Sequence, residues 1–226
     1  MLLRLFGGLL GALLVLTTFA CRGPEAARTE EPTQAQPTSA ADLEALYWVR
    51  QDSARADFTQ ADVRFMTMMI THHAQALVLS ALASTHGASE SVQTLAARIT
   101  NAQKDEIATM ERWLHERDQP VPTVDIDGTA LRVNGTSVHG RDMAGILTQA
   151  QIDTLDAARG PEFDRLFLTY MIEHHRGAVT MVDTLLDVDG AAQGEAAFRL
   201  ASEINVDQTT EIDRMRRMLS TLPDGR

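Results

Sequence analysis

Two stretches of this sequence are versions of one motif: Asp62–His73 reads DVRFMTMMITHH, and Asp164–His175 reads DRLFLTYMIEHH. Each is followed by a second motif, ITNAQKDEIATM at Ile99–Met110 and INVDQTTEIDRM at Ile204–Met215. The first pair is offset by 102 residues and the second by 105, so the two copies differ in length only between the motifs. Such repetition predicts a supersecondary unit that occurs twice.

Apolar residues recur with a helical period through four long segments, two in each repeat. We expect these helices to begin after Thr59, at Ser89, at Pro161 and at about Ala191. The first should stop at Gly87, and the last should end near Thr221, before Pro223. Short glycine-containing turns make the helices of each repeat antiparallel neighbours. The sequence therefore predicts an all-α fold, an antiparallel four-helix bundle made of two helix-hairpin repeats.

The predicted domain covers residues 42–226, with repeat one at 58–117, a connection at 118–160 and repeat two at 161–222. A lead-in helix is expected at Asp42–Arg55. The connection is rich in turn residues, and its alternating apolar residues predict a small hairpin within Val121–Met143. A short helix is expected at Thr148–Ala158.

The N-terminal segment, residues 1–20, has one arginine followed by an apolar run, and Cys21 comes next. This order resembles a bacterial lipoprotein signal peptide, with Cys21 as the lipid acceptor. Plain secretion and an uncleaved anchor helix are alternatives, although the uncharged run is slightly short for a membrane span. All three place the domain in the periplasm or cell envelope, and two of them tether it to a membrane. Residues 21–41, rich in Pro, Thr, Ala and Glu, are expected to form a disordered tether.

Composition excludes several functions. The formal net charge is −11, which argues against nucleic-acid binding because that requires clustered cations. A single cysteine excludes a disulfide framework, a cysteine-based zinc site and an iron–sulfur cluster. No nucleophile–base arrangement or phosphate-binding loop is visible, so we do not expect an enzyme. Ten methionines and seven histidines stand out in a chain that is only 5% aromatic.

On a helical wheel, the paired histidines of each repeat flank a methionine on the inward face of the first helix. The second helix of each repeat places a glutamine and a glutamate inside its apolar stripe, at Gln103 and Glu106 and at Gln208 and Glu211. A buried carboxylate without a partner costs several kcal/mol, so each glutamate should face a histidine or a metal ion.

Imidazole, thioether and carboxylate together form a mixed soft and borderline ligand set, which favours copper as Cu(I) or Cu(II) over zinc or iron. The candidate metal ligands are Met69, His72, His73, Glu106, Met110, Met171, His174, His175, Met181, Glu211 and Met215. The leading hypothesis is an extracytoplasmic protein that binds or sequesters copper.

Two other functions remain open. The same side chains are compatible with a metal-free hydrogen-bond network inside an envelope scaffolding or interaction bundle. A ferritin-like di-iron oxidoreductase is less favoured, because neither repeat contains the Glu-x-x-His pair that such sites use. His86, His115 and His139 fall at helix ends or in loops, where we expect them in solvent. The sequence indicates no protein partner and leaves a homo-oligomer open.

The motifs resemble a known family, the ferritin-like bacterial domains of unknown function that carry a His-His/Met motif. The family pattern F-x-x-x-M-I-x-H-H-x-x-A-x-x-M appears here from Phe65 and again from Phe167, and A-x-x-I-x-x-x-Q-x-x-E-I-x-x-M from Ala96 and Ala201. The resemblance implies a helical bundle, an envelope location and copper binding with a role in copper tolerance. Leu79 replaces the last methionine of the first pattern in repeat one, whereas repeat two has Met181, so repeat two is expected to be the better site.

Overall fold

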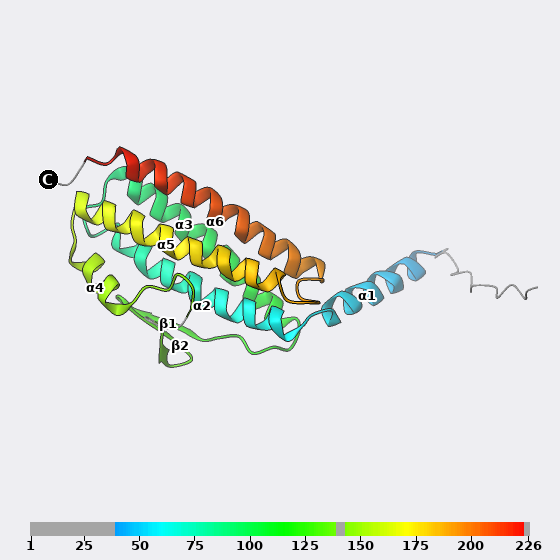
Figure 1. The fold of residues 1–226 in the computed structure, drawn as a ribbon. Coiled ribbons are helices and arrows are strands. Elements are labelled where there is room, and N and C mark those ends of the chain that lie inside the picture. The colour runs from blue at the N-terminus through cyan, green and yellow to red at the C-terminus, as the bar shows by residue number, and fades with distance from the viewer. Residues whose placement is uncertain (1–38, 139–142, 224–226) are drawn as a thin grey trace, which may run out of the picture.

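The computed structural model of the chain describes residues 39–138 and 143–223. Cys21, the leader at 1–20 and His139 lie outside them. The described residues form six helices and a small sheet of three strands (Figure 1). The helices are α1 (Ala40–Ala56), α2 (Gln60–Leu82), α3 (Glu90–His115), α4 (Gln149–Ala157), α5 (Pro161–Leu186) and α6 (Glu195–Thr221). The strands are β1 (Val124–Asp127), β2 (Ala130–Val133) and β3 (Thr136–Ser137). The fold is thus mainly helical with a small sheet, rather than purely α.

The helix starts follow the expected sequence signals. Thr59 and Asp62 form a capping box at the start of α2, Ser89 caps α3, and Pro161 occupies the first turn of α5. Two boundaries differ from expectation. Helix α2 ends at Leu82 and a turn leads to Gly87. Helix α6 begins at Glu195 instead of Ala191, because Ala192 has a left-handed backbone conformation (φ 52°) that an α-helix cannot contain.

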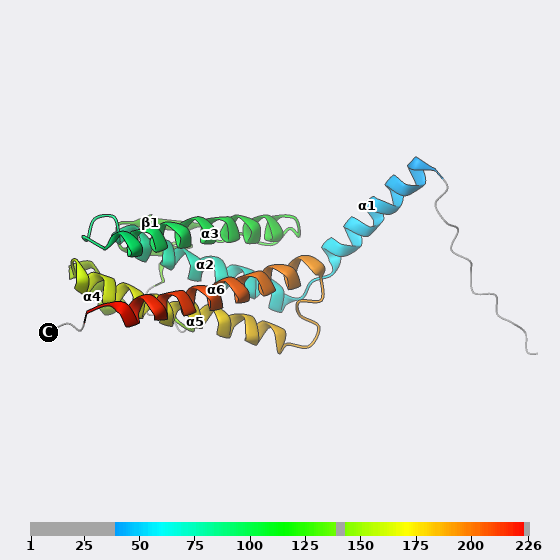
Figure 2. The ribbon, with the colours of Figure 1, turned by 90° about the horizontal axis from the view of Figure 1, so that it is seen from above.

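The four long helices pack as two hairpins, α2 with α3 and α5 with α6, and the hairpins meet mainly where α2 contacts α5 (Figure 2). Two apolar clusters fill the interior. One joins the C-terminal half of α2 to the N-terminal half of α5, and the other joins the N-terminal half of α2 to the C-terminal half of α5. The two clusters therefore show that α2 and α5 pack antiparallel.

Helix α1 projects away from the other helices in both views (Figures 1 and 2), with Leu43, Tyr47 and Trp48 exposed. Helix α2 is the one described helix long and apolar enough to cross a membrane. However, 72% of its apolar window is buried inside the protein, as expected for a core helix.

The connection between the repeats contains the expected hairpin, extended by β3, and the expected short helix α4. Leu131 and Val133 pack with Val138 against Ala74 and Val78 of α2. After the sheet, the chain returns over α2. The amide side chain of Gln75 accepts a hydrogen bond from the backbone N–H of Leu147 (2.8 Å) and donates one to its carbonyl (3.1 Å).

His86 was expected in solvent, but this expectation is wrong. The residue is 5% exposed, and the centroid of its ring lies 5.2 Å from that of Phe163. Nδ1 lies 2.9 Å from the hydroxyl of Thr85, and Nε2 lies 2.9 Å from the carbonyl oxygen of Asp156. His86 is buried because the end of α4 packs over the turn between α2 and α3. This contact joins segments that lie far apart in the sequence. His115 is exposed as expected.

Candidate metal centre

Four imidazoles lie together where α2 packs against α5. His72, His73, His174 and His175 have no solvent-exposed surface. The rings of His72 and His174 face each other across the contact between α2 and α5, with centroids 3.8 Å apart and planes inclined by 37°. Within each dipeptide the ring centroids are about 6 Å apart, 6.2 Å in α2 and 6.1 Å in α5.

Each repeat also brings one histidine to one glutamate. His175 Nε2 lies 2.7 Å from Glu211 Oε2 in good hydrogen-bond geometry. His73 Nε2 lies 2.6 Å from Glu106 Oε2, although its N–H points away from the ideal direction. The predicted juxtaposition of His-His and glutamate thus occurs in both hairpins. The carboxylates remain partly accessible, with 11% of the Glu106 side chain and 18% of the Glu211 side chain exposed.

These contacts fix which ring nitrogen carries the proton. His72 Nε2 donates to the carbonyl oxygen of Ala144 (3.1 Å), and His175 Nε2 donates to Glu211. In a neutral imidazole the other nitrogen, Nδ1, then carries a lone pair. Among the described residues, the Nδ1 atoms of all four histidines have no hydrogen-bond partner. A metal-bound imidazole commonly donates its second ring N–H to a carboxylate or carbonyl, and His72 and His175 already do so.

The central histidines are poor proton acceptors. Burial lowers the pKa of His72 and of His174 well below the usual value for an imidazole, and the neighbouring histidines lower it further. Interactions with the backbone, of His72 with Ala144 and of His174 with His72, raise these pKa values but offset only part of the effect. Both rings are therefore neutral at pH 7 and able to donate a lone pair to a cation.

Polar groups on α3 and α6 complete the surroundings. Gln103 and Gln208 are each 1% exposed, and the described residues offer no hydrogen-bond partner to the side-chain oxygen of either. Asp207 reaches solvent, but partial burial raises its pKa and the carboxylates of Glu106 and Glu211 raise it further. Three acidic groups thus lie near one another beside the buried imidazoles, which favours a cation there.

The methionines divide between the two apolar clusters in an unexpected way. Met69 and Met110 share one cluster, and Met171 and Met215 share the other. Met181, the additional methionine of repeat two, belongs to the cluster of Met69 and Met110. Because α2 and α5 run in opposite directions, the later half of α5 lies beside the earlier half of α2. The additional thioether therefore lies with the methionines of repeat one.

The donor set fits a soft or borderline cation, because it combines unpartnered imidazole nitrogens with buried thioethers, and carboxylates contact two of the imidazoles. In the described part of the chain, no three His, Cys, Asp or Glu side chains converge on one point. The convergent pairs are His73 with Glu106 and His175 with Glu211. A full coordination shell would therefore need sulfur ligands, or a rotation of the imidazoles.

Sequence reasoning missed the loop residues of this centre. Ala144, whose carbonyl accepts from His72, carries no sequence signal for that role. A usable signal did exist at Gly177, which replaces the Gln75 of repeat one. A Cβ at Gly177 would lie 2.2 Å from the carbonyl oxygen of Ala144, so only glycine lets the loop approach α5 this closely.

Comparison with known proteins gives the family. A family profile for DUF305, a domain of unknown function, matches residues 62–219. A DUF305 fragment from Deinococcus radiodurans is 31% identical, with 73% of this chain and 99% of that one covered and a TM-score of 0.60. A DUF305 protein from Streptomyces coelicolor, described as secreted, is 27% identical over 73% of this chain and 94% of its own, with a TM-score of 0.58.

Structures of CopM are also similar to this chain. The Cu(II)-bound form is 25% identical with a TM-score of 0.57, and the Cu(I)-bound form is 26% identical with a TM-score of 0.52. Each covers 70% of this chain and 95% of CopM. No protein of curated function matches the sequence. The profile match spans well over half of the chain, and the chain therefore belongs to the DUF305 family.

Proposed function

We propose that this protein is a non-enzymatic copper-binding protein of the cell envelope that holds the ion through inward histidine, methionine and glutamate side chains. The observation that carries the proposal is the set of four fully buried imidazoles whose Nδ1 atoms have no hydrogen-bond partner among the described residues. Leaving a polar atom buried and unpaired costs about 1–3 kcal/mol, and a bound metal ion would offset this cost by accepting the nitrogen lone pairs.

The relatives support the choice of metal and compartment. CopM has been solved with Cu(I), Cu(II) and silver bound, and a DUF305 relative is described as secreted. His73 and His175 would act as ligands oriented by Glu106 and Glu211. The predicted sulfur ligands are Met69, Met110, Met171, Met181 and Met215. The four long helices are taken as a ferritin-like bundle, and Cys21 as the site of lipid attachment to the membrane.

Copper titration of the purified full-length protein tests this proposal. Cu(II) is titrated in air and Cu(I) under anaerobic competition with a chromophoric chelator. We expect the variant with His174→Ala and His175→Ala to lose binding, and His115→Ala, at an exposed position, to retain it. Unchanged copper affinity in the double variant would remove the assignment.

Thermal unfolding separates this proposal from a metal-free scaffold. A ligand that binds only the folded state, present at 100 times its Kd, stabilises that state by about 2.7 kcal/mol. We therefore expect copper to raise the Tm and a chelator to reverse the rise. A Tm indifferent to copper, zinc and chelator would favour the metal-free hydrogen-bond network instead.

A further inference from the structure

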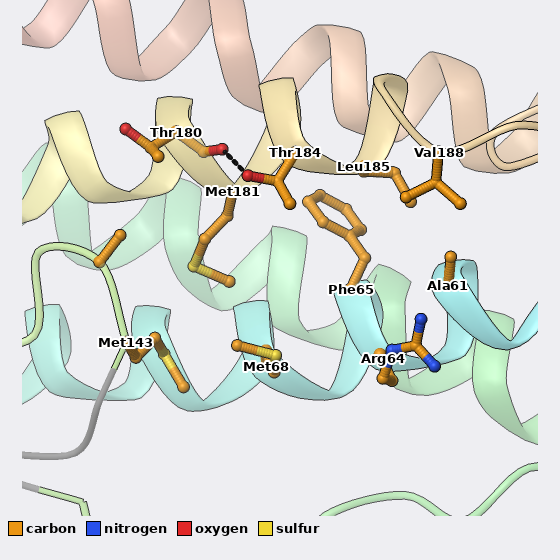
Figure 3. Close-up of a pocket in the computed structure, with 11 residues that line it drawn as sticks. Ala61, Arg64, Phe65, Met68, Met143, Thr180, Met181, Thr184, Leu185 and Val188 are labelled. Atoms are coloured by element: carbon orange, nitrogen blue, oxygen red, sulfur yellow. Dashed lines mark hydrogen bonds between the residues drawn. The ribbon is translucent and has the colours of Figure 1, made fainter.

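A separate cavity of about 250 Å³ opens between α2, α5 and the loop that follows the sheet. Three methionines line it, Met68 from α2, Met143 from the loop and Met181 from α5. Figure 3 shows their side chains gathered at one end of the cavity, away from Ala61 and Val188. Met68 is 37% exposed and Met181 is 9% exposed, so the methionines extend from the surface into the interior.

The lining leaves the thioethers as the main side-chain electron-pair donors. Among the described residues, no carboxylate, imidazole or thiol lines the cavity. Both hydroxyl groups in the lining donate hydrogen bonds to backbone carbonyls of α5. Thr184 donates to Thr180 (2.7 Å), and Thr180 donates to Arg176 (3.0 Å). Hard cations such as Mg²⁺ and Ca²⁺ bind mainly through carboxylate and other oxygen ligands, and the described side chains of the lining offer only these two uncharged hydroxyl oxygens. Thioethers instead favour soft cations such as Cu(I).

The charges around the cavity also bear on which cation it can bind. Arg64 is the one charged residue that the described part of the chain contributes to the lining, and Figure 3 places it at the end of the cavity away from Met143. The repulsion from a guanidinium is twice as large for a divalent cation as for a monovalent one at the same distance. A soft monovalent ion therefore suits this cavity better than a divalent ion.

The cavity also adjoins the imidazoles. Ala144 lines it, and the carbonyl of the same residue accepts the hydrogen bond from His72 Nε2. Ala144 thus contacts both the cavity and the buried His72.

We propose that Met68, Met143 and Met181 form a second binding site, a thioether site for a soft monovalent d¹⁰ cation, which captures the ion at the surface next to the imidazole centre. Met181, which the sequence predicts as a sulfur ligand of the histidine centre, would in this proposal serve the cavity site instead, and the other four predicted methionines would remain with the histidines. Its role in capture rests on the proposed function, whereas its affinity for the ion does not.

The test uses Ag⁺ as a redox-inert soft cation, added as the nitrate to full-length protein carrying ¹³C-labelled methionine methyl groups in chloride-free buffer. We expect the methyl signals of Met68, Met143 and Met181 to shift together. A triple variant with Met68→Leu, Met143→Leu and Met181→Leu should bind one silver ion fewer, and leucine conserves the volume of methionine well enough to keep the fold. Met218→Leu, a half-buried methionine outside the cavity, is the matched control and should change nothing.

The histidine variant distinguishes the two proposals. With His174→Ala and His175→Ala, the three methyl shifts should persist, because the cavity binds without the imidazoles. The cavity site would be overturned if the methyl signals of the three cavity methionines did not shift with Ag⁺, or if the triple variant bound as many silver ions as the parent. The copper titrations would then still decide the imidazole centre. Methyl shifts that disappear in the histidine variant would also overturn it. Persistent shifts together with unchanged copper affinity in that variant would support the cavity and remove the imidazole centre.

Discussion

The chemistry of the centre depends on the partners of individual ring nitrogens. In the α5–α6 hairpin, Glu211 holds the Nε2–H of His175 at 2.7 Å and so directs the Nδ1 lone pair into the interior. In the other hairpin, Glu106 approaches His73 to 2.6 Å with poorer alignment of the N–H. The residue-level asymmetry predicts that the histidine of α5 is the better oriented of the two.

Replacing Glu211 tests this orientation. We expect Glu211→Gln to weaken copper binding by about 10- to 100-fold, the usual effect of removing a group that orients a ligating histidine. Glu203→Gln, at an exposed position of α6, should leave the affinity unchanged. Competition titration with a chelator measures both variants. Equal affinities for the two would show that Glu211 does not orient a ligand.

The lowered pKa values of His72 and His174 predict a pH dependence of stability. The unfolded state binds more protons than the folded state once the pH falls below about 6.5, the ordinary pKa of histidine. The stabilising contribution of the neutral, buried rings is therefore complete above pH 6.5 and is lost as the pH falls towards their folded-state pKa values. Each ring should make the metal-free protein less stable by about 1.4 kcal/mol per pH unit in this window.

Urea unfolding of chelator-treated protein at pH 7.0, 6.0 and 5.0 measures this slope. His72→Gln should reduce it, because glutamine does not titrate, whereas His115→Gln at the surface should not. A slope that is the same in His72→Gln as in the parent would contradict the assignment.

Much of this centre was predictable at the residue scale. The helical period alone places both His-His pairs and the glutamates Glu106 and Glu211 on inward faces. The structure buries all four of these histidines completely. The period could not show that Met181 belongs with Met69 and Met110, since that depends on how α2 and α5 cross. It also could not supply Ala144, whose backbone carbonyl acts without any contribution from its side chain.

At the scale of elements, the loop at 143–147 controls the position of the centre. Its backbone is held on α2 by Gln75 and approaches α5 at Gly177. Gly145 of the loop contacts Gly177 of α5 and has a left-handed backbone conformation (φ 75°), so this contact needs glycine in both segments.

Gly177→Ala should disturb this contact. The added methyl group would lie 2.2–2.5 Å from backbone atoms of Ala144 and Gly145, which flexible side chains cannot relieve. We expect the free energy of unfolding to fall by about 1–3 kcal/mol, the usual cost of overpacking, despite the better helix propensity of alanine. Urea unfolding measures the loss, with Arg176→Ala at the neighbouring exposed position as control. A variant as stable as the control would indicate that the loop moves away without cost.

The elements themselves were largely predictable from sequence. The four long helices, the lead-in helix, α4 and the hairpin all occur near their expected residues. The failures lie at turns and contacts between segments. The positive φ of Ala192 shortens α6, and the burial of His86 requires the end of α4 to pack on the α2–α3 turn. Neither is encoded in a local pattern.

At the scale of the whole molecule, two equivalent aspartates join the repeats. Asp62 at the start of α2 accepts a hydrogen bond from the backbone N–H of Ala192 (2.7 Å), in the turn between α5 and α6. Asp164 at the start of α5 accepts one from the N–H of Ser89 (3.1 Å), in the turn between α2 and α3. Both side chains are buried, Asp62 at 1% and Asp164 at 3% exposure. Each hairpin thus stabilises the turn of the other.

Removing these carboxylates should destabilise the whole molecule. We expect Asp164→Ala to lower the free energy of unfolding by about 1–3 kcal/mol, because the Ser89 N–H loses its acceptor. Asp62→Ala should cost about 2–4 kcal/mol, since it also removes a capping box from α2. Chemical denaturation measures both, and Asp183→Ala on the exposed side of α5 is the control. If neither variant loses more unfolding free energy than the control, the two turns do not depend on these carboxylates for stability.

The reciprocal aspartates bear on the origin of the chain. A polypeptide with one copy of the repeat would carry both the carboxylate and the turn, but the two could meet only between separate molecules. Two identical chains related by a two-fold axis would satisfy both contacts at once. Duplication and fusion of such a gene would place both contacts within one chain, after which each half would be free to diverge. Met181, at the position that corresponds to Leu79 in repeat one, is one such difference between the two halves.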